Sequence, residues 1–228
     1  NMEAIIRETM PLLVDQREEK TNLDNEWFSA FYEKAKVCTD DQMQQLWAKV
    51  IAGEINSNGT FCKKTMSIIS DMEKDDAALF SNLCKFTFTI GEPTIVVRTV
   101  PHPLYDKFGI HFNSLKRLEH IGLIEVDNVN GYKKLNLSQE GGLFYFNILI
   151  SMKLPESDKT SLSYGSVYLT KSGKELSRIA GAEPDTEILK YSTSQWEKDG
   201  VTISSIQEMP VGDLNMSEVL SSLSKLAK

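Results

Sequence analysis

The sequence NSLKRLEHIGLIEV, residues 113–126, is the most informative part of the chain. Its first part has helical period, with Leu115 and Leu118 on one face, and Gly122 stands where glycine commonly ends a helix. Residues 123–126 read as a strand that begins at once. A helix that leads through a glycine into returning strands is typical of a winged helix-turn-helix, because the helix and the wing share one small core.

The strands after this helix are predicted from turn signals and alternation. Asn130-Gly131 is a strong signal for a two-residue turn, so we expect residues 133–137 to pair back on the strand at 123–126. Further strands are predicted at 143–153, which reads as one buried strand, and at 163–170.

The segment before the informative helix is less regular. Residues 86–90 alternate, Gly91-Glu92-Pro93 turns the chain, and residues 94–97 are β-branched, which predicts a short hairpin. Residues 101–110 contain two prolines and leave little room for a second helix of ordinary length, which departs from the winged-helix pattern.

Residues 3–85 have helical period almost throughout. Five helices are predicted there, and acidic residues stand at several of their starts, where side-chain capping and the helix dipole favour them. The first helix should begin at Ile5 and run into the charged residues 15–20, the second should begin after Asp24, and the third after Thr39 or Asp40. The fourth should span 63–72, and the fifth should begin near Asp75 and Asp76.

The C-terminal part is predicted to be helical. Ser172 and Glu175 have the spacing of a capping box, so a helix should open there and end at Gly181, and another should span 185–198. The tail carries an apolar stripe at near-heptad spacing that should dock on its own body or bind a partner, because so short a helix is marginal in isolation. The stripe comprises Met216, Val219, Leu220, Leu223 and Leu226.

Together these patterns predict an α+β fold. We expect an N-terminal helical bundle at 2–85, a winged-helix-like domain at 86–182 and a C-terminal helical extension at 183–228. A chain of 228 residues is long enough for one large or two small domains.

Composition narrows the class of protein. The formal charge of −7 disfavours non-specific attraction to nucleic acid or anionic lipid, so any nucleic-acid face must be local. Three widely spaced cysteines fit a reducing compartment, and no apolar run reaches the length of a membrane span, so we expect a cytoplasmic protein that does not bind membranes. Asn1 ahead of Met2 resembles an expression scar, so the natural protein could be longer.

Common catalytic and cofactor motifs are absent from the sequence. His102, His111 and His120 are spaced by nine, which would leave two of them half a turn out of phase on a helix, so no metal site is expected. Gly165 and Gly173-Lys174 lack the Walker spacing, and no nucleophile elbow or dinucleotide fingerprint occurs. We therefore expect no enzyme activity, no cofactor, no catalytic residues and no small-molecule substrate.

A nucleic-acid surface is the main alternative. On a winged helix, polar and basic residues of the second helix and the wing would contact base edges and phosphates, although residues 101–137 carry only five basic against four acidic residues. A solvated polar face is the other interpretation. The candidate contacts are Asn113, Lys116, Arg117, His120, Lys133 and Lys134.

Several segments resemble the bacterial domain-of-unknown-function family 2806, over about residues 40–200. They are residues 46–54 (LWAKVIAGE), 64–66 (KTM), 169–176 (LTKSGKEL) and 179–184 (IAGAEP). The resemblance implies helical domains followed by a winged-helix-like part, and an organisation similar to accessory proteins of phage-defence and abortive-infection loci. It brings no activity and no catalytic residues, and residues 203–228 lie outside it. Lys64 and Met66 depart mildly from the Arg and Leu that the family favours.

We therefore expect a non-enzymatic interaction or regulatory module in bacterial phage defence or stress response, with a protein partner or self-association. The first alternative is a winged-helix DNA-binding regulator, and the second is an enzyme of unrecognised type. A gel shift on mixed duplex DNA would separate the interaction module from the DNA-binding regulator.

Overall fold

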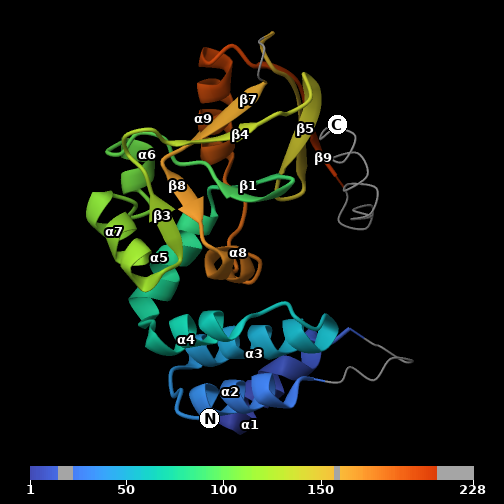
Figure 1. The fold of residues 1–228 in the computed structure, drawn as a ribbon, viewed down its shortest axis with the longest axis vertical. Helices are drawn as coiled ribbons and strands as arrows, with labels where there is room; N and C mark the ends of the chain where they lie inside the picture. Colours follow the sequence, from blue (N-terminus) through green and yellow to red (C-terminus); the bar gives the residue numbers. More distant parts are fainter. Residues whose placement is uncertain (15–22, 157–159, 210–228) are drawn as a thin grey trace.

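The computed structural model describes residues 1–14, 23–156 and 160–209. Figure 1 shows two lobes: helices α1 to α4 form one end of the molecule, and the β-sheets with the remaining helices form the other. We call these the helical lobe and the sheet lobe. Helix α8 lies at the base of the sheet lobe and faces the helical lobe, where it contacts α4. The chain is a mixed α and β protein with antiparallel sheets.

Helices α2 to α4 confirm the predicted helices of the helical lobe, whereas the first predicted helix does not continue past Leu12, because Leu13 has an extended backbone. Residues 15–20 lie outside the described residues. Asp24 accepts a hydrogen bond from the N–H of Trp27, and Asp40 accepts from the N–H groups of Gln42 and Met43, so both predicted acidic caps are confirmed. The elements are α1 (Met2–Thr9), the 3-10 helix η1 (Met10–Leu12), α2 (Asn25–Ala35), α3 (Asp41–Asn56) and α4 (Lys63–Asp71).

Aromatic side chains form the centre of this lobe. The Trp27 and Phe31 rings stack with centroids 5.5 Å apart, and Phe31 meets Trp47 of α3 edge-on at 5.4 Å. All three side chains are buried, and such ring pairs add to the hydrophobic gain of burial. The result is a rigid base for the loop that follows α3.

The sheet lobe is built around a five-stranded antiparallel sheet in the order β2-β1-β5-β6-β9. Phe88 of this sheet packs against Tyr145 and against Trp196 of α9, and the Trp196 indole N–H donates to the Ser163 carbonyl at 2.9 Å. The strands are β1 (Thr87–Ile90), β2 (Glu92–Ile95), β3 (Ile124–Val126), β4 (Tyr132–Leu135), β5 (Glu140–Tyr145), β6 (Ile148–Lys153), β7 (Ser161–Gly165), β8 (Val167–Leu169) and β9 (Thr202–Glu208). The helices are α5 (Lys74–Cys84), α6 (Pro103–Asp106), α7 (Phe112–Ile121), α8 (Lys171–Ser177) and α9 (Thr186–Lys198).

The predicted hairpin across Asn130-Gly131 is wrong. Strand β3 pairs with β8 and β4 pairs with β7, so the two strands lie end to end along one partner ribbon instead of against each other. Asp127 accepts hydrogen bonds from the N–H groups of Val129 and Asn130, and its own N–H donates to the Ser166 carbonyl. These bonds guide the chain along the ribbon.

The predicted single strand at 143–153 is also wrong, because the segment contains a hairpin. Strands β5 and β6 pair in register around Phe146 and Asn147, and Phe146 takes a left-handed backbone at φ 53°. A non-glycine residue tolerates this conformation where its surroundings hold it. The Phe146 ring meets that of Tyr145 edge-on at 5.0 Å, which places apolar surface at the turn.

The C-terminal extension is not wholly helical. Helix α9 confirms the helix predicted at 185–198, but residues 202–208 form β9, which pairs antiparallel with β6 at the edge of the five-stranded sheet. The apolar residues of β9, Ile203 and Ile206, are three positions apart and do not alternate with polar ones, so the sequence gives no period-two signal for this strand. The candidate partner-binding residues Met216, Val219, Leu220, Leu223 and Leu226 lie outside the described residues.

Helix α7 confirms the predicted helix, and Gly122 ends it in the left-handed conformation at φ 93°. Helix α8 confirms a helix but not its predicted cap. Thr170 is the N-cap and accepts from the Gly173 N–H at 3.1 Å, while Ser172 and Glu175 point to the helical lobe. The expected capping box is therefore replaced by a contact between lobes.

Candidate functional site: a basic cleft between the lobes

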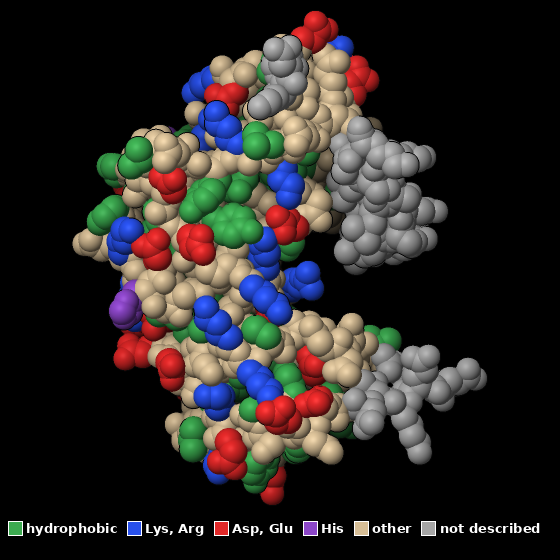
Figure 2. All heavy atoms as spheres, in the orientation of Figure 1, with side chains coloured by type: hydrophobic (Ala, Val, Ile, Leu, Met, Phe, Trp, Pro, Cys, Tyr) green, Lys and Arg blue, Asp and Glu red, His purple; other side chains and the backbone are tan. Residues whose placement is uncertain are grey.

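A polar cleft of about 520 Å³ opens between the two lobes. One wall is the loop after α3, residues 57–60, and the other comes from β8 and α8 of the sheet lobe. Figure 2 shows that Lys and Arg side chains gather on this face of the molecule, around the hollow where the lobes part. The sheet-lobe residues that line the cleft are Tyr168, Lys171, Lys174, Glu175 and Arg178.

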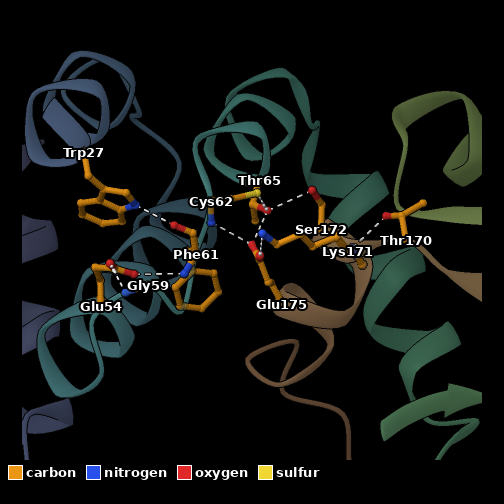
Figure 3. Close-up of polar contacts among 11 residues, drawn as sticks. Trp27, Glu54, Gly59, Phe61, Cys62, Thr65, Thr170, Lys171, Ser172 and Glu175 are labelled. Atoms are coloured by element: carbon orange, nitrogen blue, oxygen red, sulfur yellow. Dashed lines mark hydrogen bonds and ion pairs between the residues drawn. The ribbon is translucent and has the colours of Figure 1, made fainter. Parts of the chain in front are cut away.

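The loop wall is held in place by a buried carboxylate. Glu54, which is 2% exposed, accepts hydrogen bonds from the N–H of Gly59 at 2.6 Å and from the N–H of Phe61 at 3.0 Å. The indole N–H of Trp27 donates to the Phe61 carbonyl at 2.7 Å (Figure 3). Because these bonds satisfy backbone groups at the end of the loop, the wall is preorganised.

The α8 wall is fastened to α4 by a second buried carboxylate. Glu175 accepts from the Thr65 hydroxyl at 2.5 Å and from the Cys62 N–H at 3.0 Å, and the Thr65 and Ser172 hydroxyls are 2.9 Å apart (Figure 3). Thr65, Ser172 and Glu175 are all buried. A buried carboxylate needs such partners, so this latch, Thr65–Ser172–Glu175, fixes the position of α8 against the helical lobe.

Three basic residues follow one face of α8 at spacings of three and four. The Lys171 side chain is 79% exposed, and its Nζ lies 3.9 Å from the Glu175 carboxylate. Arg178 is exposed and forms no ion pair within the part of the chain that the structure describes. Both cations are therefore available to an anion in the cleft.

Lys174 connects the cleft to a small charge network on the sheet lobe. Its Nζ contacts the Glu92 carboxylate at 2.7 Å and the Tyr168 hydroxyl at 2.9 Å, and Lys134 reaches Glu92 at 3.1 Å. The hydrogen bond from Lys174, supported by Lys134, holds the pKa of Glu92 below its usual value. Partial burial acts to lower the pKa of Lys174, but its bonds to Glu92 and Tyr168 outweigh this effect and raise it.

Three tyrosines lie beside this network. Tyr132 stacks parallel to Tyr164 with ring centroids 6.1 Å apart, and lies 5.5 Å from Tyr168. Lys174 sits over the Tyr168 ring at 4.6 Å. Tyr164 is buried, whereas Tyr132 and Tyr168 are half-buried, and Figure 2 shows hydrophobic side chains exposed over β8. We call Tyr132, Tyr164 and Tyr168 the tyrosine cluster; burial raises the pKa of Tyr164 to about 12.

The predicted nucleic-acid residues on α7 are exposed but partly paired. Asn113, Lys116, Arg117 and His120 all face solvent. Lys116 contacts Glu119 at 2.6 Å, and Arg117 forms ion pairs with Asp76 and Glu73 of α5. Their charges are thus already balanced within the protein.

The two predicted wing lysines lie on opposite sides of β4, as alternation along a strand requires. Lys134 faces the Glu92 network, whereas Lys133 lines a separate polar hollow with Arg98, Ser163 and Asp199. The structure therefore brings only Lys134 of the six predicted contacts into the network beside the basic cleft.

Two of the histidines and the cysteine Cys62 make local contacts in the structure. His102 and His111 cap α6 and α7, and the Cys62 thiol lies 3.3 Å from the Thr65 hydroxyl. Within residues 1–14, 23–156 and 160–209, no group of three or more His, Cys, Asp or Glu side chains could hold a metal ion. Over the same residues, no helix has the length and hydrophobicity to cross a bilayer.

Sequence reasoning missed the basic face of α8 and the tyrosine cluster. The spacing of Lys171, Lys174 and Arg178 was a readable signal, since residues three and four apart share a helix face. The tyrosines were not readable as a group, because Tyr132 meets the other two only through the pairing of β4 with β7.

Comparison with known proteins agrees with the family resemblance. The model of the family described as "Protein of unknown function (DUF2806)" matches residues 1–192. Neither a curated protein nor a solved structure matches the chain.

Proposed function

Because the chain belongs to this family of unknown function, we propose from its geometry that it is a non-enzymatic binding module that holds an anionic, phosphate-rich partner in the interlobe cleft. The observation that carries the proposal is the face of α8, where Lys171 and Arg178 are exposed at the cleft and Lys174 stands between them. Phosphate oxygens are good acceptors for such cations.

The charge of the cleft supports an anion despite the net charge of −7. Lys171, Lys174 and Arg178 line the cleft together with one carboxylate, that of Glu175. The adjoining network adds Lys134 and Glu92, which pair with each other. Glu175 accepts hydrogen bonds from Thr65 and from a backbone N–H, so its carboxylate is directed to the helical lobe and is stabilised there. Clefts with low-dielectric walls strengthen such a local field.

The test uses inorganic polyphosphate of about 15 phosphates at low salt, a probe that carries charge without bases. We expect binding by isothermal titration calorimetry, and Lys171→Glu with Arg178→Glu should weaken it about tenfold or more, because attraction becomes repulsion. The matched control is Lys190→Glu with Lys198→Glu, an equal charge change on exposed positions of α9. Equal loss in both double variants would mean that only net charge matters, which contradicts the proposal.

A second candidate function is duplex DNA binding through a winged-helix-like unit. The order α6, α7, β3 and β8 favours it, with β3 and β8 antiparallel and β4–β7 extending them as a wing. The ion pairs of Lys116 and Arg117 weigh against strong phosphate contacts.

A gel shift on mixed-sequence duplex DNA at low salt separates the two candidates. Loss of the shift in Lys116→Glu with Arg117→Glu, but not in the α8 double variant, would favour the winged helix. The reverse pattern would favour the cleft. A regulatory role, a bacterial origin and a place in phage defence or stress response stay predictions that rest on the resemblance.

A further inference from the structure

We propose that the cleft and the tyrosine cluster form one continuous surface for single-stranded nucleic acid, with phosphates on α8 and bases stacked on Tyr132 and Tyr168. This inference rests on the proposed anion-binding function and names its ligand class. The juxtaposition that carries it is Lys174, which belongs to both parts: it lines the cleft and lies 4.6 Å from the centre of the Tyr168 ring.

The tyrosine cluster has the geometry of a stacking platform. Tyr164 forms a buried layer, and Tyr132 lies parallel to it with an interplanar angle of 9°. Tyr168 extends the aromatic surface from β8 to the cleft that it lines. Exposed aromatic rings on strands are the usual stacking partners of unpaired bases, and basic side chains beside them follow the phosphates.

Charges around the cluster determine towards which side of it a bound polyanion extends. Glu119, Glu125 and Asp127 lie near Tyr132 and, after burial, act to raise the pKa of its hydroxyl. The basic residues Lys171, Lys174 and Arg178 line the cleft, and Lys134 joins them through Glu92, which also pairs with Lys174. A polyanion that stacks on the tyrosines is therefore attracted towards α8 and repelled from the side of α7.

A single strand fits this surface better than a duplex. Base stacking on tyrosine requires faces that a duplex keeps within its own stack. The preference should tolerate sequence, because every base has an aromatic face.

The experiment measures the affinity of the full chain for fluorescein-labelled oligo-dT of about 15 nucleotides by anisotropy, with polyphosphate of similar charge as competitor. Tyr132→Leu and Tyr168→Leu should each weaken oligo-dT binding about tenfold, because they remove stacking. Tyr132 does not line the cleft, so Tyr132→Leu should leave polyphosphate affinity unchanged. Tyr132→Phe and Tyr168→Phe, which keep the rings, should retain most of the oligo-dT affinity.

The matched control is Tyr32→Leu. Tyr32 is an exposed tyrosine of the helical lobe with Lys36 over its ring at 5.8 Å, so it repeats the tyrosine–lysine pair away from the cleft. It should not change either affinity. Thermal unfolding of each variant identifies any that fails to fold. If a leucine variant fails to fold, the oligo-dT affinity of the matching phenylalanine variant decides whether the ring without its hydroxyl supports binding.

The two levels of the proposal fail differently. Loss of both ligands in the α8 double variant with unchanged oligo-dT binding in the leucine variants would overturn the stacking inference and leave the anion cleft standing. No binding of either ligand would overturn both. Tighter binding of a duplex, or of a polyglutamate peptide of similar charge, would also overturn the inference, in favour of duplex DNA or an acidic protein partner.

Discussion

At the level of single residues, three carboxylates shape the cleft and its surroundings: Glu54 and Glu175 are buried, and Glu92 is half-exposed. Glu54 and Glu175 each satisfy backbone N–H groups of the segment 59–62, which follows α3 and leads into α4. These hydrogen bonds position the walls of the cleft.

Removing the Thr65 hydroxyl should destabilise the protein. Thr65→Val keeps the shape but removes the hydrogen bond to Glu175 and the contact with Ser172, so a buried carboxylate loses a donor at a cost of about 1–3 kcal/mol. The measurement is the free energy of unfolding in urea. Thr60→Val, at a half-buried position in the adjacent loop, is the control and should cost clearly less; an unchanged stability of the Thr65 variant would refute the latch.

Replacing Glu92 by glutamine should lower the stability of the fold but strengthen the binding of polyphosphate. Since its folded pKa lies below the usual 4.5, the carboxylate stabilises the fold above that pH and loses this contribution as the pH falls through the folded pKa. Glu92→Gln should therefore cost about 0.5–1 kcal/mol at pH 7, and in pH-dependent urea unfolding the difference should disappear once the pH is below the folded pKa of Glu92. The same variant should bind polyphosphate more tightly at pH 7, because it removes a negative charge beside Lys174; weaker binding would contradict the proposed site.

At the level of elements, the position of α8 depends on a close crossing with the chain after α7. A Cβ on Gly173 would lie 2.0 Å from the Leu123 carbonyl oxygen. The Thr170 hydroxyl also donates to the Gly122 carbonyl at 2.7 Å. Helix and strand can approach this closely only because position 173 has no side chain.

Gly173→Ala should therefore destabilise the protein by at least about 2 kcal/mol, since the new methyl group meets rigid backbone. It should also weaken polyphosphate binding, because α8 must shift. Ser177→Ala in the same helix is the control, as it removes only a local bond to the Lys174 carbonyl. The comparison is made by thermal unfolding and calorimetry, and equal melting temperatures for the two variants would count against the crossing.

At the level of the whole molecule, one hydrophobic cluster runs through both lobes. It joins Met66 and Ile69 of α4 with Leu176 of α8 and continues into the sheet lobe. The cleft therefore lies beside a continuous core and not beside a free hinge.

Calorimetry should show one cooperative unfolding transition for the chain, with equal calorimetric and van't Hoff enthalpies. Thr65→Val combined with Ser172→Ala weakens the polar contacts between α4 and α8. It should therefore lower the ratio of the van't Hoff enthalpy to the calorimetric enthalpy, or split the transition. Two resolved transitions in the unmodified chain would show that the lobes unfold independently and would contradict this picture.

Local patterns in the chain predicted much of the secondary structure. Acidic caps, helical periods and the stop at Gly122 appear where expected, because each depends on residues within a few positions of one another. The family resemblance could likewise be recognised from short sequence segments, and the family match over residues 1–192 confirms it. The winged-helix arrangement stays a prediction.

Contacts between distant segments could not be predicted in the same way. Strands of similar alternation can pair in several ways, so nothing local distinguished β3 with β8 from a hairpin of β3 with β4. Glu175 had the spacing of a capping residue, yet its carboxylate reaches Thr65, 110 positions earlier. The tyrosine cluster and the basic cleft exist only because folding brings such segments together, since packing and the burial of polar groups are settled over the whole molecule.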